Sequence, residues 1–203
     1  NLSFVKFFLK VTNFMSAEVF LPLNPVEILN LYKQNVLPGV IKRRYVEKLD
    51  LSDVLKPIRP YFKAVDSEDD KYVALARLMT FSSCKGFGVD DVVAAYLFHA
   101  GRNLGKEMYW KGLVKTIDDL FRAFLKYKVG LVDIVKESED VVVIDVYECI
   151  LCSGLPVINK PVCYFEAGVL SAIFEKLVGA NTVKEEKCWC LGDLKCRFKV
   201  EFF

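Results

Sequence analysis

The sequence has very little histidine and no excess of basic charge. One histidine occurs in 203 residues, which excludes a catalytic or metal site built from several imidazoles of one chain. Lysine and arginine number 28 against 26 aspartates and glutamates, so the chain lacks the electrostatic footprint of a nucleic-acid-binding protein. No stretch of about 18 residues is free enough of charge to span a membrane. We therefore expect neither direct nucleic-acid binding nor a membrane span.

A good secretory signal is also missing from the beginning of the sequence. Residues 1–20 are apolar, but Lys6, Lys10 and Glu18 interrupt them and no small-residue cleavage site follows. The seven cysteines are an odd number and are clustered, unlike those of a secreted disulfide framework. We expect a cytoplasmic protein whose thiols are reduced or bound to metal.

Helix-start signals dominate the first part of the chain. An asparagine cap, a proline at the first helical position and a glutamate at the third mark Asn24-Pro25-Val26-Glu27 as a helix start. Capping residues and early acidic residues, which the helix dipole favours, mark further starts near Ser67, Asp90 and Thr116. These signals predict helices over residues 24–36, 67–82, 90–108 and 116–130.

The later part of the chain changes to strands around one apolar helix. Valine- and isoleucine-rich segments predict strands over 131–136 and 141–148, and two more are expected over 182–191 and 195–203. Residues 160–178 are apolar on two sides, which indicates a central buried helix. In the last strand Cys196, Phe198, Val200 and Phe202 share one face, so Cys196 points toward the core. The sequence predicts an α+β fold: a helical N-terminal part, then a central buried helix packed on antiparallel strands.

Six of the seven cysteines lie in the last 55 residues. Cys163 opens the apolar helix, Cys188 follows Glu185 by three residues, and Cys196 follows Gly192-Asp193. Zinc takes about four ligands, and thiolates and carboxylates serve. A tight turn between Cys188 and Cys196 would bring the two thiols together, and the dipole at the helix start favours a thiolate at Cys163. This pattern predicts a metal site that joins the helix to the last two strands.

The residues alone leave the ligand set open. In a regular strand Glu186 shares a face with Cys188, so Glu185 joins the site only if the strand bulges or begins between Glu185 and Cys188. Alternatives are an all-thiolate site or an iron–sulfur cluster drawn from Cys149, Cys152, Cys188, Cys190 and Cys196. Cys84 lies apart from the others and is expected to be a small buried hydrophobe.

The C-terminal motifs resemble a known family. Val162-Cys163-Tyr164-Phe165-Glu166-Ala167-Gly168-Val169-Leu170 is followed by Gly179, then Glu185-x-x-Cys188, then Gly192-Asp193-x-x-Cys196-Arg197-Phe198. This order resembles the 4-vinyl reductase domain family, which also supplies the hydrocarbon-sensing module of some bacterial transcription activators. The resemblance covers roughly residues 85–203 and leaves residues 1–84 as a mostly helical N-terminal extension.

The resemblance implies several properties of the domain. The fold would be the one shared by vesicle-tethering subunits and haem nitric-oxide sensor domains. A zinc ion would be held by Cys163, Glu185, Cys188 and Cys196. Family members are often homodimers and enclose an apolar pocket for a small hydrophobic ligand. The resemblance thus favours Glu185 over Glu186 in spite of the alternation along a regular strand.

A pocket for an apolar molecule is lined by aromatic side chains and a few polar groups. The candidate ligand-binding residues are Tyr96, His99, Trp110 and Phe165, and the competing interpretation of His99 is an ordinary core or surface histidine. Gly101 and Gly105, four residues apart, would let another element approach their helix closely.

The leading hypothesis is a zinc-stabilised cytoplasmic module that binds a small hydrophobic ligand as a sensor or carrier. One alternative is a reductase acting on a vinyl or similar group, which needs a reductant. Gly86-Phe87-Gly88 is not a nicotinamide-binding fingerprint, and Cys149 and Cys152 are the redox pair that this alternative would use. The other alternative is an assembly subunit with a large apolar interface. We assign no catalytic residue.

Overall fold

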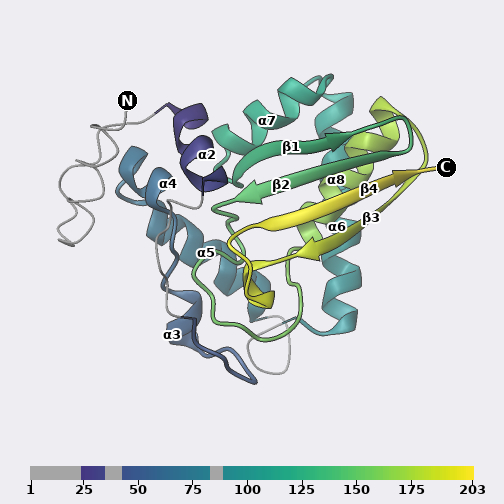
Figure 1. Ribbon diagram of the computed structural model, residues 1–203. Coiled ribbons are helices and arrows are strands. Elements are labelled where there is room, and N and C mark those ends of the chain that lie inside the picture. The colour runs from purple at the N-terminus through teal and green to yellow at the C-terminus, as the bar shows by residue number, and fades with distance from the viewer. Residues whose placement is uncertain (1–23, 35–42, 83–88) are drawn as a thin grey trace.

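The computed structural model describes residues 24–34, 43–82 and 89–203 of the chain. It confirms the α+β class: helices pack on one face and at one end of a four-stranded sheet (Figure 1). The helices are α2 Pro25–Lys33, α3 Leu51–Val54, α4 Pro60–Val65, α5 Asp69–Phe81, α6 Asp91–Trp110, α7 Ile117–Lys126 and α8 Tyr164–Leu177. The strands are β1 Leu131–Glu137, β2 Val141–Tyr147, β3 Asn181–Lys187 and β4 Cys196–Phe202. None of the described helices is long and apolar enough to cross a bilayer.

The sheet is antiparallel throughout, in the order β1-β2-β4-β3. The predicted strands over 131–136 and 141–148 are confirmed as β1 and β2, which form a hairpin in which the Ser138 N–H donates to the Val141 carbonyl at 2.9 Å. On one face Ile144, Phe198 and Val200 are fully buried, in agreement with the alternation expected for the last strand. On the other face Arg197 donates two hydrogen bonds, of 2.7 and 2.8 Å, to the carboxylate of Asp145.

Helix α8 lies against the buried face of the sheet, and α6 packs on α8 (Figure 1). Residues 166–174 of α8 are all buried, which confirms the prediction of a central buried helix. The sequence predicted that this helix begins at residue 160, but it begins at Tyr164. Lys160 precedes Pro161, and a residue before proline is disfavoured in helical conformation.

Helices α6 and α8 meet through glycines. A Cβ atom at Gly101 would lie 2.1 Å from the Phe165 carbonyl oxygen, and one at Gly105 would lie 2.7 Å from that of Val169. A Cβ atom at Gly168 of α8 would lie equally close to the Phe98 carbonyl oxygen, at 2.1 Å. The predicted close approach to Gly101 and Gly105 is therefore confirmed, and it sets the distance between the two helices.

The helices of the first part of the chain are held to the sheet by a buried carboxylate. Glu148, which follows β2, accepts hydrogen bonds from the Tyr32 hydroxyl at 2.6 Å and from the backbone N–H groups of Tyr61 and Phe62 at 2.9 and 3.2 Å. Burial raises the pKa of Glu148 to about 7. One side chain thus connects α2 and α4 to the end of β2.

Local start signals were predicted well. The Asn24 side chain accepts from the Val26 N–H, and Thr116 and Asp119 bond each other's backbone N–H groups as a capping box. Helix α5 begins at Asp69 with Glu68 as its cap, so Ser67 is not the cap. The expectations for residues 1–20, Cys84 and residues 85–88 lie outside the described residues.

The predicted strand 182–191 is too long. Strand β3 ends at Lys187, and Trp189–Leu191 form one turn of 3₁₀ helix, η1. Gly192 closes this turn with φ of +103°, a conformation that favours glycine. The turn carries the chain from β3 to β4 and places Cys188 at its start.

We predict that Gly101→Ala destabilises the protein, because the added methyl group would collide with the backbone of α8. The expected loss in the free energy of unfolding is about 1–3 kcal/mol, despite the higher helix propensity of alanine. The exposed Asn103 lies on the same helix, and Asn103→Ala should change the free energy by less than about 0.5 kcal/mol. Urea unfolding of both variants measures the difference, and a more stable Gly101→Ala protein would contradict the glycine contact.

Candidate metal centre

The N-terminus of α8 is fixed by a carboxylate of β3. Cys163 is the residue that caps the helix, and its thiol is fully buried. Its backbone N–H donates to Oε2 of Glu185 at 3.1 Å. Helix starts attract negative charge, so this position suits both the carboxylate and a thiolate. The contact brings together two of the residues that the family resemblance implied.

A bulge in β3 brings Glu185 to the same side as Cys188. The pairing of β3 with β4 shifts between Glu185 and Lys187. This is the bulge that a site containing both Glu185 and Cys188 requires. Glu185 faces inward, whereas Glu186 is exposed. Glu186 is therefore not a member of the cluster. The alternation of a regular strand, taken alone, would have placed Glu186 rather than Glu185 beside Cys188.

The turn after β3 holds Cys188 in place. The Asp193 N–H donates to the Cys188 carbonyl at 3.1 Å, and the Cys188 N–H donates to the Asp193 carboxylate at 3.4 Å. Strand β4 then begins at Cys196, whose side chain points into the core as predicted. The tight turn thus places two thiols on the same side of the sheet.

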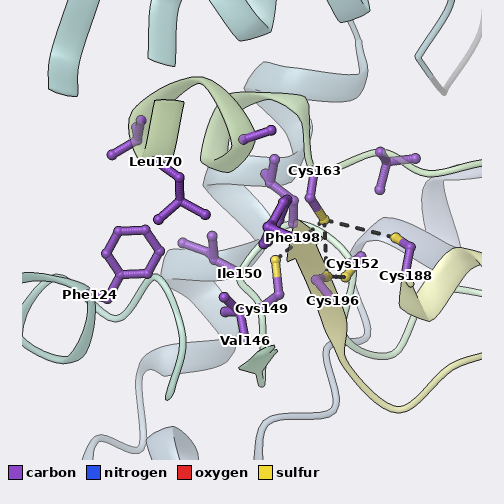
Figure 2. Packing of buried hydrophobic residues seen from close by; sticks show 14 of the residues in the cluster. Phe124, Val146, Cys149, Ile150, Cys152, Cys163, Leu170, Cys188, Cys196 and Phe198 are labelled. Carbon is purple, nitrogen blue, oxygen red and sulfur yellow. Dashed lines mark hydrogen bonds between the residues drawn. The ribbon is translucent and has the colours of Figure 1, made fainter. Parts of the chain in front are cut away.

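The thiols converge on the start of α8 (Figure 2). The Cys163 sulfur lies 3.4 Å from that of Cys196, 3.5 Å from that of Cys149 and 4.0 Å from that of Cys188. The sulfurs of Cys152 and Cys196 are 3.2 Å apart. Four sulfurs around a zinc ion are separated by about 3.8 Å, the edge of a tetrahedron with Zn–S bonds of about 2.3 Å. These distances suit ligands that share one small ion and are too short to enclose an iron–sulfur cluster with its inorganic sulfides.

Among the described residues, two groups of four donors meet the distance requirement of a metal site. The Glu185 set consists of Cys163, Glu185, Cys188 and Cys196, and the all-thiolate set consists of Cys149, Cys152, Cys163 and Cys196. Within each set all ligand atoms lie within 4.8 Å of one another. The first set contains the residues that the resemblance implied. The second includes the Cys149-x-x-Cys152 pair, but with Cys163 in place of Cys188 and Cys190.

A positive charge would stabilise the buried acidic groups of the cluster. Burial and the neighbouring Cys188 thiol raise the pKa of Glu185 well above its usual range, and burial likewise raises the pKa of Cys163 and Cys196. Oε1 of Glu185 is buried and accepts no hydrogen bond from any described residue. A divalent cation that accepts both oxygen and sulfur ligands would bind this oxygen and favour the deprotonated thiols. The cluster is thus compatible with a metal ion.

Two buried charged residues beside the cluster were not singled out as site residues from the sequence. Glu166 of α8 is buried, and the Cys149 thiol donates to its Oε1 at 3.5 Å. A charged residue in an otherwise apolar helix was the available signal for it. Arg77 of α5 is also buried and donates to the carbonyls of Ile150 and Ser153 at 2.9 and 2.6 Å. Its partners lie more than 70 residues away in the chain, and the sequence carries no local signal for them.

The candidate ligand-binding residues lie apart from the thiols. Tyr96, His99 and Trp110 are on the exposed face of α6, where Tyr96 is 70% and Trp110 61% exposed. Phe165 is half-buried on α8, at the contact with Gly101. The structure thus brings three of the four to one helix face and does not enclose them with Phe165 in a cavity of the described chain.

A surface groove of about 630 Å³ lies elsewhere, on the sheet face that carries Asp145. Lys33, Asp133, Asp145 and Lys195 are among the residues that line it. Its charged lining does not suit an apolar molecule.

Comparison with known proteins places the cluster in a known domain. The sequence model of the V-4-R domain, the 4-vinyl reductase domain, matches residues 142–202, which include β2 from its second residue, α8, β3, β4 and all six thiols of the cluster region. The uncharacterized protein MJ1642 of Methanocaldococcus jannaschii is 34% identical over 130 residues, which are 63% of this chain and 76% of that protein.

Two solved structures resemble this chain over part of its length. A vinyl-4-reductase family protein from Methanocaldococcus jannaschii has 23% identity and a TM-score of 0.44, over 64% of this chain and 79% of that one. The phenol-responsive sensory domain of the transcription activator PoxR, solved with phenol, has 14% identity and a TM-score of 0.46, over 64% and 72%. With the domain match and a relative that is 34% identical and covered over 76% of its length, this chain belongs to the family of 4-vinyl reductase domain proteins.

Proposed function

We propose that this chain is a zinc-stabilised, cytoplasmic 4-vinyl reductase-type module that binds a small hydrophobic molecule and acts as a sensor or carrier. The buried Glu185 set is the observation that carries the proposal, because its carboxylate oxygen is unpartnered among the described residues and faces three thiols. The family supplies the class of ligand. Residues 85–203 would form the module, and residues 1–84 its helical extension.

The role of zinc in this proposal is structural. Four protein donors close a tetrahedral site and leave no open position for a substrate. The ion would tie the start of α8 to the end of β3 and the start of β4, and so fix the helix on which α6 packs. Cys149 and Cys152, which the reductase alternative would use as a redox pair, lie in the same cluster, which favours metal binding for them as well.

A second copy of the chain would complete the ligand site. Tyr96, His99 and Trp110 form an exposed, largely aromatic face on α6, and Val92 of the same helix is 79% exposed. Exposed apolar faces of this kind are common at protein interfaces. We assign the homodimer contact to this face of α6, with the ligand held between α6 and Phe165.

The zinc proposal predicts that Cys163→Ser loses both metal and stability, since binding a structural zinc contributes to folding. We expect about one zinc or more per chain in wild-type protein purified without added metal. In the variant the free energy of unfolding should fall by several kcal/mol, which lowers the melting temperature by roughly 10 °C. Elemental analysis and thermal unfolding measure the two effects. Cys190 is buried but belongs to neither donor set, so Cys190→Ser is the matched control and should retain its metal.

The ligand proposal predicts that His99→Ala weakens binding of a small aromatic probe without unfolding the protein. Phenol is a suitable probe, because it combines an apolar ring with one hydroxyl group that an imidazole can bind. The loss of one hydrogen bond should weaken binding by roughly tenfold. Calorimetry measures the affinity, and equal affinities of the two proteins would remove His99 from the site.

The dimer proposal predicts that charges on α6 separate the two copies. Tyr96→Glu combined with Trp110→Glu should weaken the dimer by at least about tenfold, because like charges would face each other across the interface. Leu75 on α5 is 59% exposed, and Leu75→Glu is the control for a charge placed elsewhere. Sedimentation equilibrium measures the association, and a wild-type chain that is monomeric at all concentrations would contradict the proposal.

A further inference from the structure

The two donor sets overlap in a specific way. They share the thiols of Cys163 and Cys196, whose sulfurs are 3.4 Å apart, and each set adds two donors of its own. Cys149 and Cys152 complete one set, and Glu185 and Cys188 complete the other. In Figure 2 the sulfurs of Cys149 and Cys188 lie on opposite sides of Cys163. The cluster is therefore one continuous group of six donors with two shared sulfurs in its middle.

One ion would leave part of this group unused. A zinc ion takes about four ligands, so an ion in the Glu185 set leaves the buried thiols of Cys149 and Cys152 without a metal. An ion in the all-thiolate set instead leaves Cys188 without a metal and Oε1 of Glu185 without a partner. Six donors satisfy two four-coordinate ions when two of the donors are shared. Thiolate sulfur can bridge two zinc ions in this manner, as it does in Zn₂Cys₆ modules.

We propose that this chain holds two divalent d¹⁰ metal ions in a binuclear centre bridged by the thiolates of Cys163 and Cys196. Cys149 and Cys152 complete the first site, and Glu185 and Cys188 complete the second. The inference deepens the proposed function, since it rests on the same Glu185 set and adds a second ion. Zinc is the expected metal, because the donors are five thiolates and one carboxylate.

The charges around the cluster support this assignment. Five thiolates and one carboxylate carry six negative charges, of which two divalent ions neutralise four. Arg77 is fully buried, and the described hydrogen bonds of its guanidinium go to backbone carbonyls rather than to a carboxylate. Burial lowers the pKa of Arg77 to about 10, and the neighbouring thiols of Cys152 and Cys149 oppose this shift. A buried guanidinium needs a compensating negative charge, and the excess charge of a binuclear thiolate centre supplies it.

The backbone around Arg77 joins it to the first site. Its donors bind the carbonyls of Ile150 and Ser153, which belong to or adjoin the Cys149-x-x-Cys152 segment. The guanidinium thus both orders the loop that carries the terminal thiols and places its positive charge beside them. Arg77 is a positioning residue in this proposal and contacts no metal.

The number of ions per chain tests the proposal. We expect native mass spectrometry and elemental analysis of the full chain to find two zinc ions in the wild-type protein. Cys149→Ser and Cys152→Ser should each lose one ion and keep the other, whereas Cys190→Ser should keep both. One ion in the wild type that survives in Cys149→Ser overturns the binuclear centre and leaves the proposed function standing. A single ion that is lost in Cys149→Ser but kept in Cys188→Ser, or no ion at all, overturns both.

Cobalt substitution tests the bridges without any variant, so it remains decisive if a serine variant fails to fold. Cobalt(II) added to the metal-free wild-type chain should produce sulfur-to-cobalt absorption that rises until two equivalents are bound. The electron paramagnetic resonance signal of the first ion should weaken as the second binds, because bridging sulfur couples the two spins. Absorption that saturates at one equivalent, or two ions whose signals simply add, would overturn the shared thiolates.

Discussion

The attachment of the α8 start to two strands is the constraint on which the rest of the structure depends. Cys163 caps the helix, and its backbone N–H donates a hydrogen bond to the Glu185 carboxylate. Its sulfur lies 3.4 Å from the sulfur of Cys196 at the beginning of β4. This attachment fixes where α8 enters the core, and the glycine contacts then fix α6 on α8. The sheet, the buried helix and the outer helix are thereby positioned relative to one small cluster of sulfur atoms.

Much of the fold could be predicted because its signals are local. The capping residues Asn24 and Thr116 marked helix starts that depend only on neighbouring N–H groups, and the alternation in β4 pointed Cys196 inward. The end of β3 could not be placed, because the 3₁₀ turn that follows depends on how Asp193 holds Cys188. Local capping chemistry thus placed the starts of α2 and α7, whereas the end of β3 depends on a contact made five residues further along the chain.

The candidate site was predictable in part. The family resemblance identified Glu185, although the alternation of a regular strand favours Glu186 and only the bulge reverses it. The position of Cys149 beside Cys163 depends on the path of the chain after β2, which no periodic pattern encodes. The burial of Arg77 likewise depends on distant backbone carbonyls. Tertiary contacts, rather than residue types, decide these features.

The bulge in β3 has a consequence for how the chain avoids aggregation. Strand β3 is at the edge of the sheet, where unpaired backbone groups can template the addition of a strand from another molecule. The bulge disturbs the regular spacing of these groups, and Thr182, Lys184 and Glu186 cover the exposed face with polar and charged side chains. The irregularity that brings Cys188 to the side of Glu185 therefore also blunts the open edge, so that a single backbone distortion both assembles the buried cluster and protects the sheet from edge-to-edge pairing.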